Sequence, residues 1–150
     1  MKKIILSLAL WAAISVSAMA QVSGNAIGVR GGIGSELSYQ HKLSGGTRME
    51  FDFGWYFNHG LNVAAVHHWV FDLSELSNGF NWYVGVGPQV GLWTYDNEGL
   101  AVGVAGQIGL EYNFNIPLQL SLDYRPGFYL VPAGHRGAWE GAALGIRYRF

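Results

Sequence analysis

The sequence predicts an all-β fold class: an eight-stranded antiparallel up-and-down transmembrane β-barrel that is preceded by a cleaved signal peptide. Three observations support this prediction. Eight segments alternate apolar and polar residues with a period of two, which is typical of β-strands. The charged residues of those segments fall on the face opposite the large apolar side chains. After residue 20, no stretch is uniformly apolar over the length that a membrane helix needs.

The N-terminal residues have the pattern of an export signal. Two lysines follow Met1, residues 4–16 form an almost unbroken apolar run, and residues 18–20 read Ala-Met-Ala. A positive start, a short apolar core and a small-x-small site together indicate a signal peptide. We therefore expect a signal peptide over residues 1–20, cleavage between Ala20 and Gln21, and one barrel domain over residues 21–150.

The composition limits the class of protein further. The chain has no cysteine, which excludes a disulfide framework and a lipid anchor at the cleavage site. Its formal net charge of −1 is too small to indicate a nucleic-acid partner. Only 13% of the residues are charged, whereas about 25% is usual for a soluble domain, and 15% are aromatic. These values favour an outer surface that faces lipid.

The eight alternating segments are separated by turn-like residues. The third gives the clearest pattern, with an apolar face formed by Met49, Phe51, Phe53, Trp55 and Phe57. Segments of this length match tilted membrane strands, which need about 9–11 residues. The approximate bounds of the eight expected strands are 25–33, 36–43, 48–57, 61–72, 80–93, 100–114, 118–130 and 142–150.

Several local features of these strands carry their own expectations. Gly34 and Ser35 predict a tight turn after the first strand. Pro88 and Pro126 each remove a ladder donor within a strand, so we expect bulges or irregular pairing there. His67 falls on the apolar face of the fourth strand, which leaves the register of that strand open.

The charged face of the strands predicts the interior of the barrel. It carries equal numbers of basic and acidic residues, and such a balance is expected where an unpaired charge would cost several kcal/mol. A soluble barrel, the alternative, would need the opposite polarity. We expect a filled lumen without an open channel, in which Arg147 and Arg149 pair with acids such as Glu36 or Glu50. The predicted ion-pair network comprises Arg30, Glu36, Lys42, Arg48, Glu50, Asp52, Asp72, Glu111, Asp123, Arg125, Arg147 and Arg149.

No catalytic, cofactor or metal site is predicted. His67 and His68 point to opposite faces of one strand, so they cannot chelate one ion together. A lipid A-modifying enzyme remains an alternative, yet His135 lacks the serine that a deacylase barrel places two residues later. A palmitoyltransferase barrel would need an apolar slot inside. A small porin or transport barrel is a further alternative. An adhesin would need long loops, and only residues 131–137 offer one.

The last strand, residues 142–150, carries a family resemblance. Arg147 and Arg149 alternate with apolar residues, and the chain stops on a phenylalanine. With the signal peptide, the eight segments and the charged lumen, residues 21–150 resemble the small eight-stranded outer-membrane β-barrel family of the OmpA/OmpX type. The Gly-Ile-Arg-Tyr-Arg-Phe ending and the Ala-Gln junction look like those of Bacteroidetes proteins. The motif that carries the resemblance is the terminal assembly signal, formed by Gly145, Ile146, Tyr148 and Phe150.

The resemblance implies a location and a set of partners. It implies a monomer of the bacterial outer membrane that contacts membrane lipid and lipopolysaccharide and is inserted by the barrel-assembly machinery. It implies a structural or surface-interaction role, with no enzyme activity, no cofactor and no nucleic-acid partner.

Overall fold

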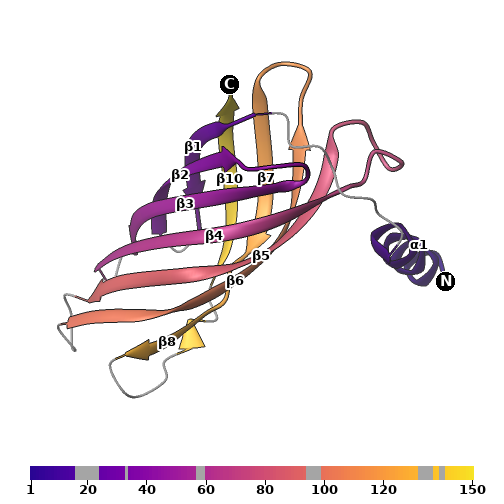
Figure 1. The fold of residues 1–150 in the computed structure, drawn as a ribbon. Helices are drawn as coiled ribbons and strands as arrows, with labels where there is room; N and C mark the ends of the chain where they lie inside the picture. The colour runs from indigo at the N-terminus through magenta and orange to yellow at the C-terminus, as the bar shows by residue number, and fades with distance from the viewer. Residues whose placement is uncertain (16–23, 33, 57–59, 94–98, 132–136, 139–140) are drawn as a thin grey trace.

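The computed structural model describes residues 1–15, 24–32, 34–56, 60–93, 99–131, 137–138 and 141–150. A helix, α1, lies apart from ten strands (Figure 1). Among the described residues, no helix combines the length and the apolar character needed to cross a bilayer. The elements are α1 (Lys2–Ser15), β1 (Ala26–Gly31), β2 (Gly34–Lys42), β3 (Thr47–Tyr56), β4 (Gly60–Asp72), β5 (Phe80–Trp93), β6 (Gly99–Asn113), β7 (Leu118–Tyr124), β8 (Gly127–Val131), β9 (Gly137–Ala138) and β10 (Ala142–Arg149).

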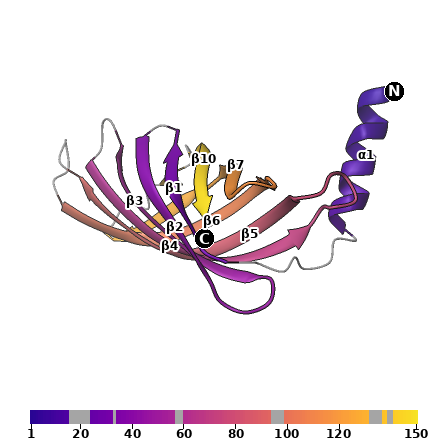
Figure 2. The ribbon, with the colours of Figure 1, turned by 90° about the horizontal axis from the view of Figure 1, so that it is seen from above.

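The strands form one closed antiparallel barrel (Figures 1 and 2). Each strand from β1 to β6 pairs with the next, β6 pairs with both β7 and β8, and β10 pairs with β7 and β1. Since β7 and β8 follow one another along β6, they count as one of the eight barrel strands, and β9 with β10 counts as another. The predicted all-β, eight-stranded antiparallel barrel is thereby confirmed. The start of the first barrel strand meets the end of the last one where Asn25 and Phe150 exchange backbone hydrogen bonds of 3.1 and 2.9 Å, and we call this end of the barrel the terminus end.

The two prolines interrupt the pairing as expected, but without shifting it. Pro126 separates β7 from β8, while its carbonyl accepts a hydrogen bond of 2.9 Å from the backbone N–H of Gly106. The register against β6 is the same on both sides of the break. Pro88 lies where the ladder between β4 and β5 skips two pairs. The register shift lies instead between Val102 and Gly103, so the expected bulge is not at either proline.

The tight turn predicted at Gly34 and Ser35 is wrong. Both residues belong to β2, where Gly34 pairs with Tyr56 and Ser35 pairs with Trp55. Gly31 already pairs with Ser35 across the β1–β2 ladder, and the Gly32 N–H donates to the Gly34 carbonyl at 3.0 Å. Because β3 continues to Tyr56, β2 gains ladder hydrogen bonds by starting at Gly34.

Burial alternates along the strands, with polar residues inside and apolar residues outside. In β4, His68 is fully buried, whereas its neighbour His67 lies on the outer face and packs edge-on against Trp69 at 4.6 Å. His67 pairs with Met49 on one side and Val86 on the other. The predicted facing of the fourth strand is therefore confirmed, and its register is now defined.

The seam between β1 and β10 leads to a prediction about closure. A Cβ at Gly28 would lie 1.9 Å from the Ile146 carbonyl oxygen and 2.6 Å from Arg147 Cα, so Gly28→Val should force the two strands apart. Overpacking of this kind typically costs up to about 3 kcal/mol of folding free energy. We expect the free energy of unfolding in urea to fall by that amount. The folded fraction is measured at each urea concentration as the share of unboiled protein that keeps its folded gel mobility.

Gly31→Ala is the matched control for this prediction. Gly31 lies in the same strand, and a Cβ there would meet nothing within 4 Å. Its stability should stay within about 0.5 kcal/mol of the wild type. Equal effects of the two substitutions would contradict the seam described above.

Candidate functional site

The candidate site is the barrel interior, where nine charged side chains of the described residues are buried. Period-two alternation turns one residue in two inward from every strand, and closure of the barrel then removes those side chains from water. All nine are at most 5% exposed. They are Arg30, Glu36, Arg48, Glu50, Asp52, Glu111, Asp123, Arg125 and Arg147.

The larger charge cluster lies toward the end opposite the chain termini. Arg30 binds Glu36 at 2.9 Å through Nη1, and its Nε donates to Asp123 at 3.0 Å. Arg125 binds the same Glu36 at 2.7 Å and Asp52 at 2.6 Å. Two arginines therefore share three carboxylates, and Glu36 bridges both cations. Charge-assisted hydrogen bonds of this kind are the strong ones in a dry interior.

The second cluster lies nearer the terminus end. Arg48 and Glu111 form two contacts, one of 3.1 Å from Nη1 to Oε1 and one of 2.8 Å between Nη2 and Oε2. The Nδ2 group of Asn81 donates to the same carboxylate at 3.2 Å. Arg48 Nε donates to Nδ1 of His68 at 3.1 Å, so this histidine nitrogen acts as the acceptor.

Polar side chains around Glu50 extend the second cluster, and Tyr83 joins that cluster to the larger one through Asp123. Glu50 accepts hydrogen bonds from Gln40 at 2.7 Å and Gln107 at 3.2 Å, and it forms an ion pair with Arg147 at 3.2 Å. Gln107 also lies 3.0 Å from the second ring nitrogen of His68. The interior is thus one continuous polar network.

An aromatic side chain fills the centre of this network. The Tyr83 ring stacks on His68 at 4.6 Å, lies 4.9 Å from the Arg48 guanidinium carbon, and its hydroxyl donates to Asp123 at 3.3 Å. Tyr83 and His68 are 0% exposed and Arg147 is 1% exposed. These three large side chains close the lumen at mid-height.

Three residues of the predicted network lie near the terminus end, apart from the buried pairs. Arg149 was expected to pair with an acid, but its Nη2 donates to the backbone carbonyls of Phe114 and Ile116 at 2.6 and 3.1 Å. Asp72 instead accepts hydrogen bonds from the backbone and hydroxyl of Ser74. Lys42 forms no ion pair with the described residues. Their positions have inward parity, yet the strands end there and leave the side chains near water.

Neutral residues complete the network, and a count of charges alone does not find them. Strand parity already turns Tyr83, His68 and Gln107 inward, which was the available signal. Their role as links between ion pairs depends on contacts across the lumen, and parity does not specify such contacts.

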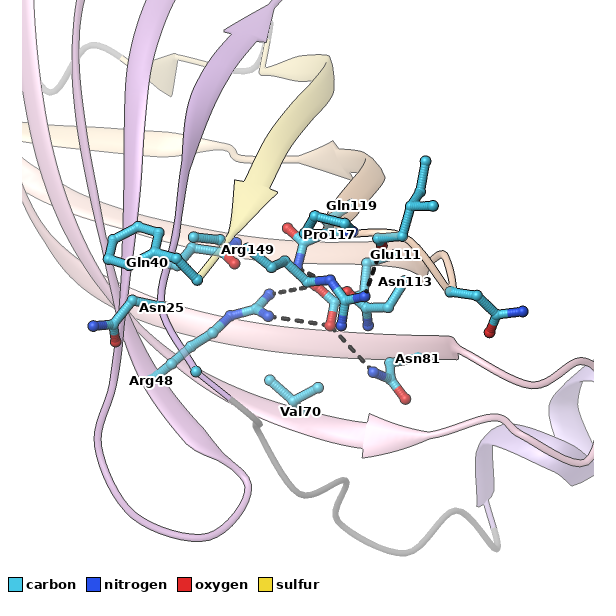
Figure 3. A pocket seen from close by; sticks show the side chains of 15 residues that line it. Asn25, Gln40, Arg48, Val70, Asn81, Glu111, Asn113, Pro117, Gln119 and Arg149 are labelled. Atoms are coloured by element: carbon cyan, nitrogen blue, oxygen red, sulfur yellow. Dashed lines mark hydrogen bonds and ion pairs between the residues drawn. The ribbon is translucent and has the colours of Figure 1, made fainter.

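A blind pocket of about 340 Å³ opens at the terminus end (Figure 3). Each of the eight barrel strands contributes at least one residue to its wall. The Arg48–Glu111 ion pair lies at its floor, and the closed centre of the lumen lies behind it. Its lining comprises Gly24, Asn25, Ala26, Gln40, Arg48, Val70, Asn81, Glu111, Asn113, Asn115, Ile116, Pro117, Gln119, Arg149 and Phe150.

The terminal motif divides between the two faces of β10. Gly145 faces inward, where a Cβ would lie 2.4 Å from the Ser121 hydroxyl and 2.7 Å from Arg147 Nη1. Ile146, Tyr148 and Phe150 are more than half exposed on the outer face. The predicted cleavage site at Ala20 and Gln21, as well as Phe57 and His135, lies outside the described residues. Within the described ranges, no group of three metal-ligating side chains could hold an ion.

The fold is similar to a solved structure described as the crystal structure of Neisserial surface protein A (NspA). The TM-score is 0.59, the sequence identity is 13%, and the alignment covers 84% of this chain and 93% of that chain. At this identity the likeness concerns the fold. No protein-family model matches the sequence. No curated protein matches it either.

The ion pair between Arg48 and Glu111 shares neither partner with another ion pair of the described residues, and it therefore allows a test of the network. Arg48→Met should lower the free energy of unfolding by about 3–5 kcal/mol, because it leaves a buried carboxylate without its cation. The double variant R48M/E111L should recover most of that loss, since an apolar pair can replace a buried ion pair at little cost. Urea unfolding followed by tryptophan fluorescence measures both effects.

Asp72→Asn is the control for this cycle. It removes one charge near the terminus end but leaves the buried pairs intact, so its effect should stay below about 1 kcal/mol. A double variant no more stable than R48M would contradict the pairing.

Proposed function

We propose that this chain is an integral protein of the bacterial outer membrane, a monomeric barrel whose lumen is filled and charge-paired. Its role in the membrane is structural or surface-interacting, and it has no catalytic activity. Residues 1–20 act as a signal peptide, and the mature chain belongs to the OmpA/OmpX type of small barrels.

The inverted polarity of the barrel carries this proposal. Large apolar side chains cover the outer face; Phe51, Trp55 and Leu122 are 45%, 53% and 54% exposed. A surface of this kind is stable when lipid covers it and aggregates in water. Closure also satisfies the backbone hydrogen bonds of neighbouring strands, which is the condition that lipid imposes on a spanning structure.

Aromatic side chains on the outer face near the terminus end support a membrane boundary there. Phe71 stacks on Trp82 at 4.5 Å, and Tyr112 meets Phe114 edge-on at 4.8 Å. Aromatic girdles of this kind flank the apolar band of outer-membrane barrels. After export, the chain reaches that membrane from the periplasm, so we assign the terminus end to the periplasmic side.

The filled lumen favours a closed barrel over a porin or transport barrel. Tyr83, His68 and Arg147 occupy the centre, and each forms a hydrogen bond with a neighbouring polar side chain. A buried network of charges also leaves no apolar slot for an acyl chain, which argues against a lipid A palmitoyltransferase. The name of the similar structure, a surface protein, agrees with a non-enzymatic role at the cell surface.

The exposed end of β10 suits delivery to the outer membrane. Tyr148 and Phe150 stack at 6.4 Å on the outer face, where a partner can contact both rings. We propose that the barrel-assembly machinery binds this end, and that the finished barrel contacts membrane lipid along its sides and lipopolysaccharide at its outer rim.

Substitution on the outer face tests the membrane assignment. Leu122 lies near the middle of the barrel strand that β7 and β8 form together. Leu122→Arg should therefore destabilise the barrel in lipid vesicles by about 2–4 kcal/mol. Ile116→Arg, in the exposed turn between β6 and β7, should cost about 1 kcal/mol or less. The measurement is urea unfolding of the protein purified from outer-membrane fractions. The intact mass of that protein should match a chain that begins at Gln21.

A soluble barrel gives the opposite result in this experiment. L122R would then improve solubility and leave stability unchanged, and the protein would fractionate without membranes.

Conductance in planar bilayers tests the closed lumen. Wild-type protein should give no large, stable channel, because the three central side chains block the interior. Tyr83→Ala together with His68→Ala removes two of them and should produce measurable current. Large, steady conductance of the wild type would favour the porin alternative.

A further inference from the structure

We propose that the pocket at the terminus end binds a small oxyanion, a carboxylate or phosphate group of a soluble molecule, and that Arg149 is its main anchor. This goes beyond the proposed membrane role, because it assigns a ligand site to one end of the barrel.

The side chains that line the pocket carry more positive than negative charge. Arg48, Arg149 and Glu111 converge on the same space (Figure 3). Glu111 forms its ion pair with Arg48 through two contacts. The other arginines of the described residues each pair with a side-chain acid, whereas Arg149 pairs with none. An anionic ligand would supply the acceptor that this guanidinium lacks.

Arg149 has donor capacity that the protein leaves unused. Its Nη2 group holds two backbone carbonyls, which fixes the side chain against the wall of the pocket. Its Nε atom is buried and has no hydrogen-bond acceptor. Buried polar groups almost always have a partner, so an unpaired guanidinium N–H beside a cavity points to an absent acceptor.

Two carboxamides extend the donor set around the pocket. The Asn25 side-chain oxygen accepts from the backbone N–H of Lys42 at 2.9 Å, and the Asn113 oxygen accepts from Gln119 at 3.2 Å. A carboxamide whose oxygen is engaged still has two N–H donors. Neither Nδ2 group donates a hydrogen bond to the described residues. The pocket therefore offers donors of three side chains from the ends of β1, β6 and β10.

The size and chemistry of the pocket limit the ligand. A volume of about 340 Å³ is at the low end for small-molecule sites, which are commonly about 300–1,000 Å³. Six carboxamide and two guanidinium residues in the wall disfavour an acyl chain. Because the floor is closed by Arg48 and Glu111, a ligand enters from the periplasmic side and leaves the same way. It is bound and does not pass through.

Titration of the folded barrel in detergent micelles tests this proposal. Inorganic phosphate and succinate are added separately, with sodium chloride of equal ionic strength as the reference. We expect saturable shifts of the Arg149 side-chain Nε–H signal in NMR spectra, at millimolar concentrations or below. A response to only one of the two anions identifies the headgroup, phosphate or carboxylate.

Arg149→Gln should weaken the affinity about tenfold or more, because it removes a charge-assisted donor. Lys42→Gln is the matched control: it removes the same charge near the same end, but its side chain does not line the pocket. Its affinity should stay within about twofold of the wild type if local contacts act rather than general attraction. Asn113→Ala, which keeps every charge, should weaken binding severalfold and covers the case in which R149Q fails to fold.

Failure of this proposal is distinguishable from failure of the membrane assignment. Absence of a saturable Nε–H shift with either anion, or equal losses in R149Q and K42Q, overturns the binding site. Neither result changes the boiled-versus-unboiled gel mobility or the L122R outcome, which report on the barrel in its membrane.

Discussion

The pairing of buried charges across a narrow lumen is the interaction on which the rest of this structure depends. Ladder hydrogen bonds join only neighbouring strands, whereas the ion pairs of the described residues, apart from Arg30–Glu36, join strands that are not neighbours. Arg125, beside β7, holds acids on β2 and β3; Arg147 on β10 holds β3; and Arg48 on β3 holds β6. Several closures of eight strands satisfy the backbone. The ion pairs select one of them, since a slip of one seam would leave buried charges unpaired.

Glycines on the inner face make this network possible. A Cβ at Gly109 would lie 2.6 Å from the Tyr83 ring, and one at Gly85 would lie 2.5 Å from His68. The two glycines therefore leave the volume that the central aromatic and imidazole rings occupy. The same choice fills the centre of the lumen, because both rings point into it.

Strand number, facing and the inward position of most charges could be predicted from the sequence, because all three follow from a period of two. The partners could not. Whether Arg147 meets Glu36 or Glu50 depends on the stagger of the closed barrel, which no single strand contains. Parity also cannot tell where a strand stops being enclosed, so Arg149 was assigned to the buried network although it lies at the mouth. The prediction of a turn at Gly34 was wrong for a related reason: pairing with the long strand β3 outweighed the local turn preference of these residues.

The division of the surface explains where any interaction with soluble molecules must occur. The sides of the barrel present apolar groups outward, and the buried charges pair with one another. Unused hydrogen-bond donors remain at the ends of the strands. There the barrel no longer surrounds the side chains, and residues such as Arg149 point inward without an acid opposite them. A small barrel of this design concentrates its chemistry at its rims. At the terminus-end pocket, a cation without a side-chain acid, unused donors and a cavity coincide.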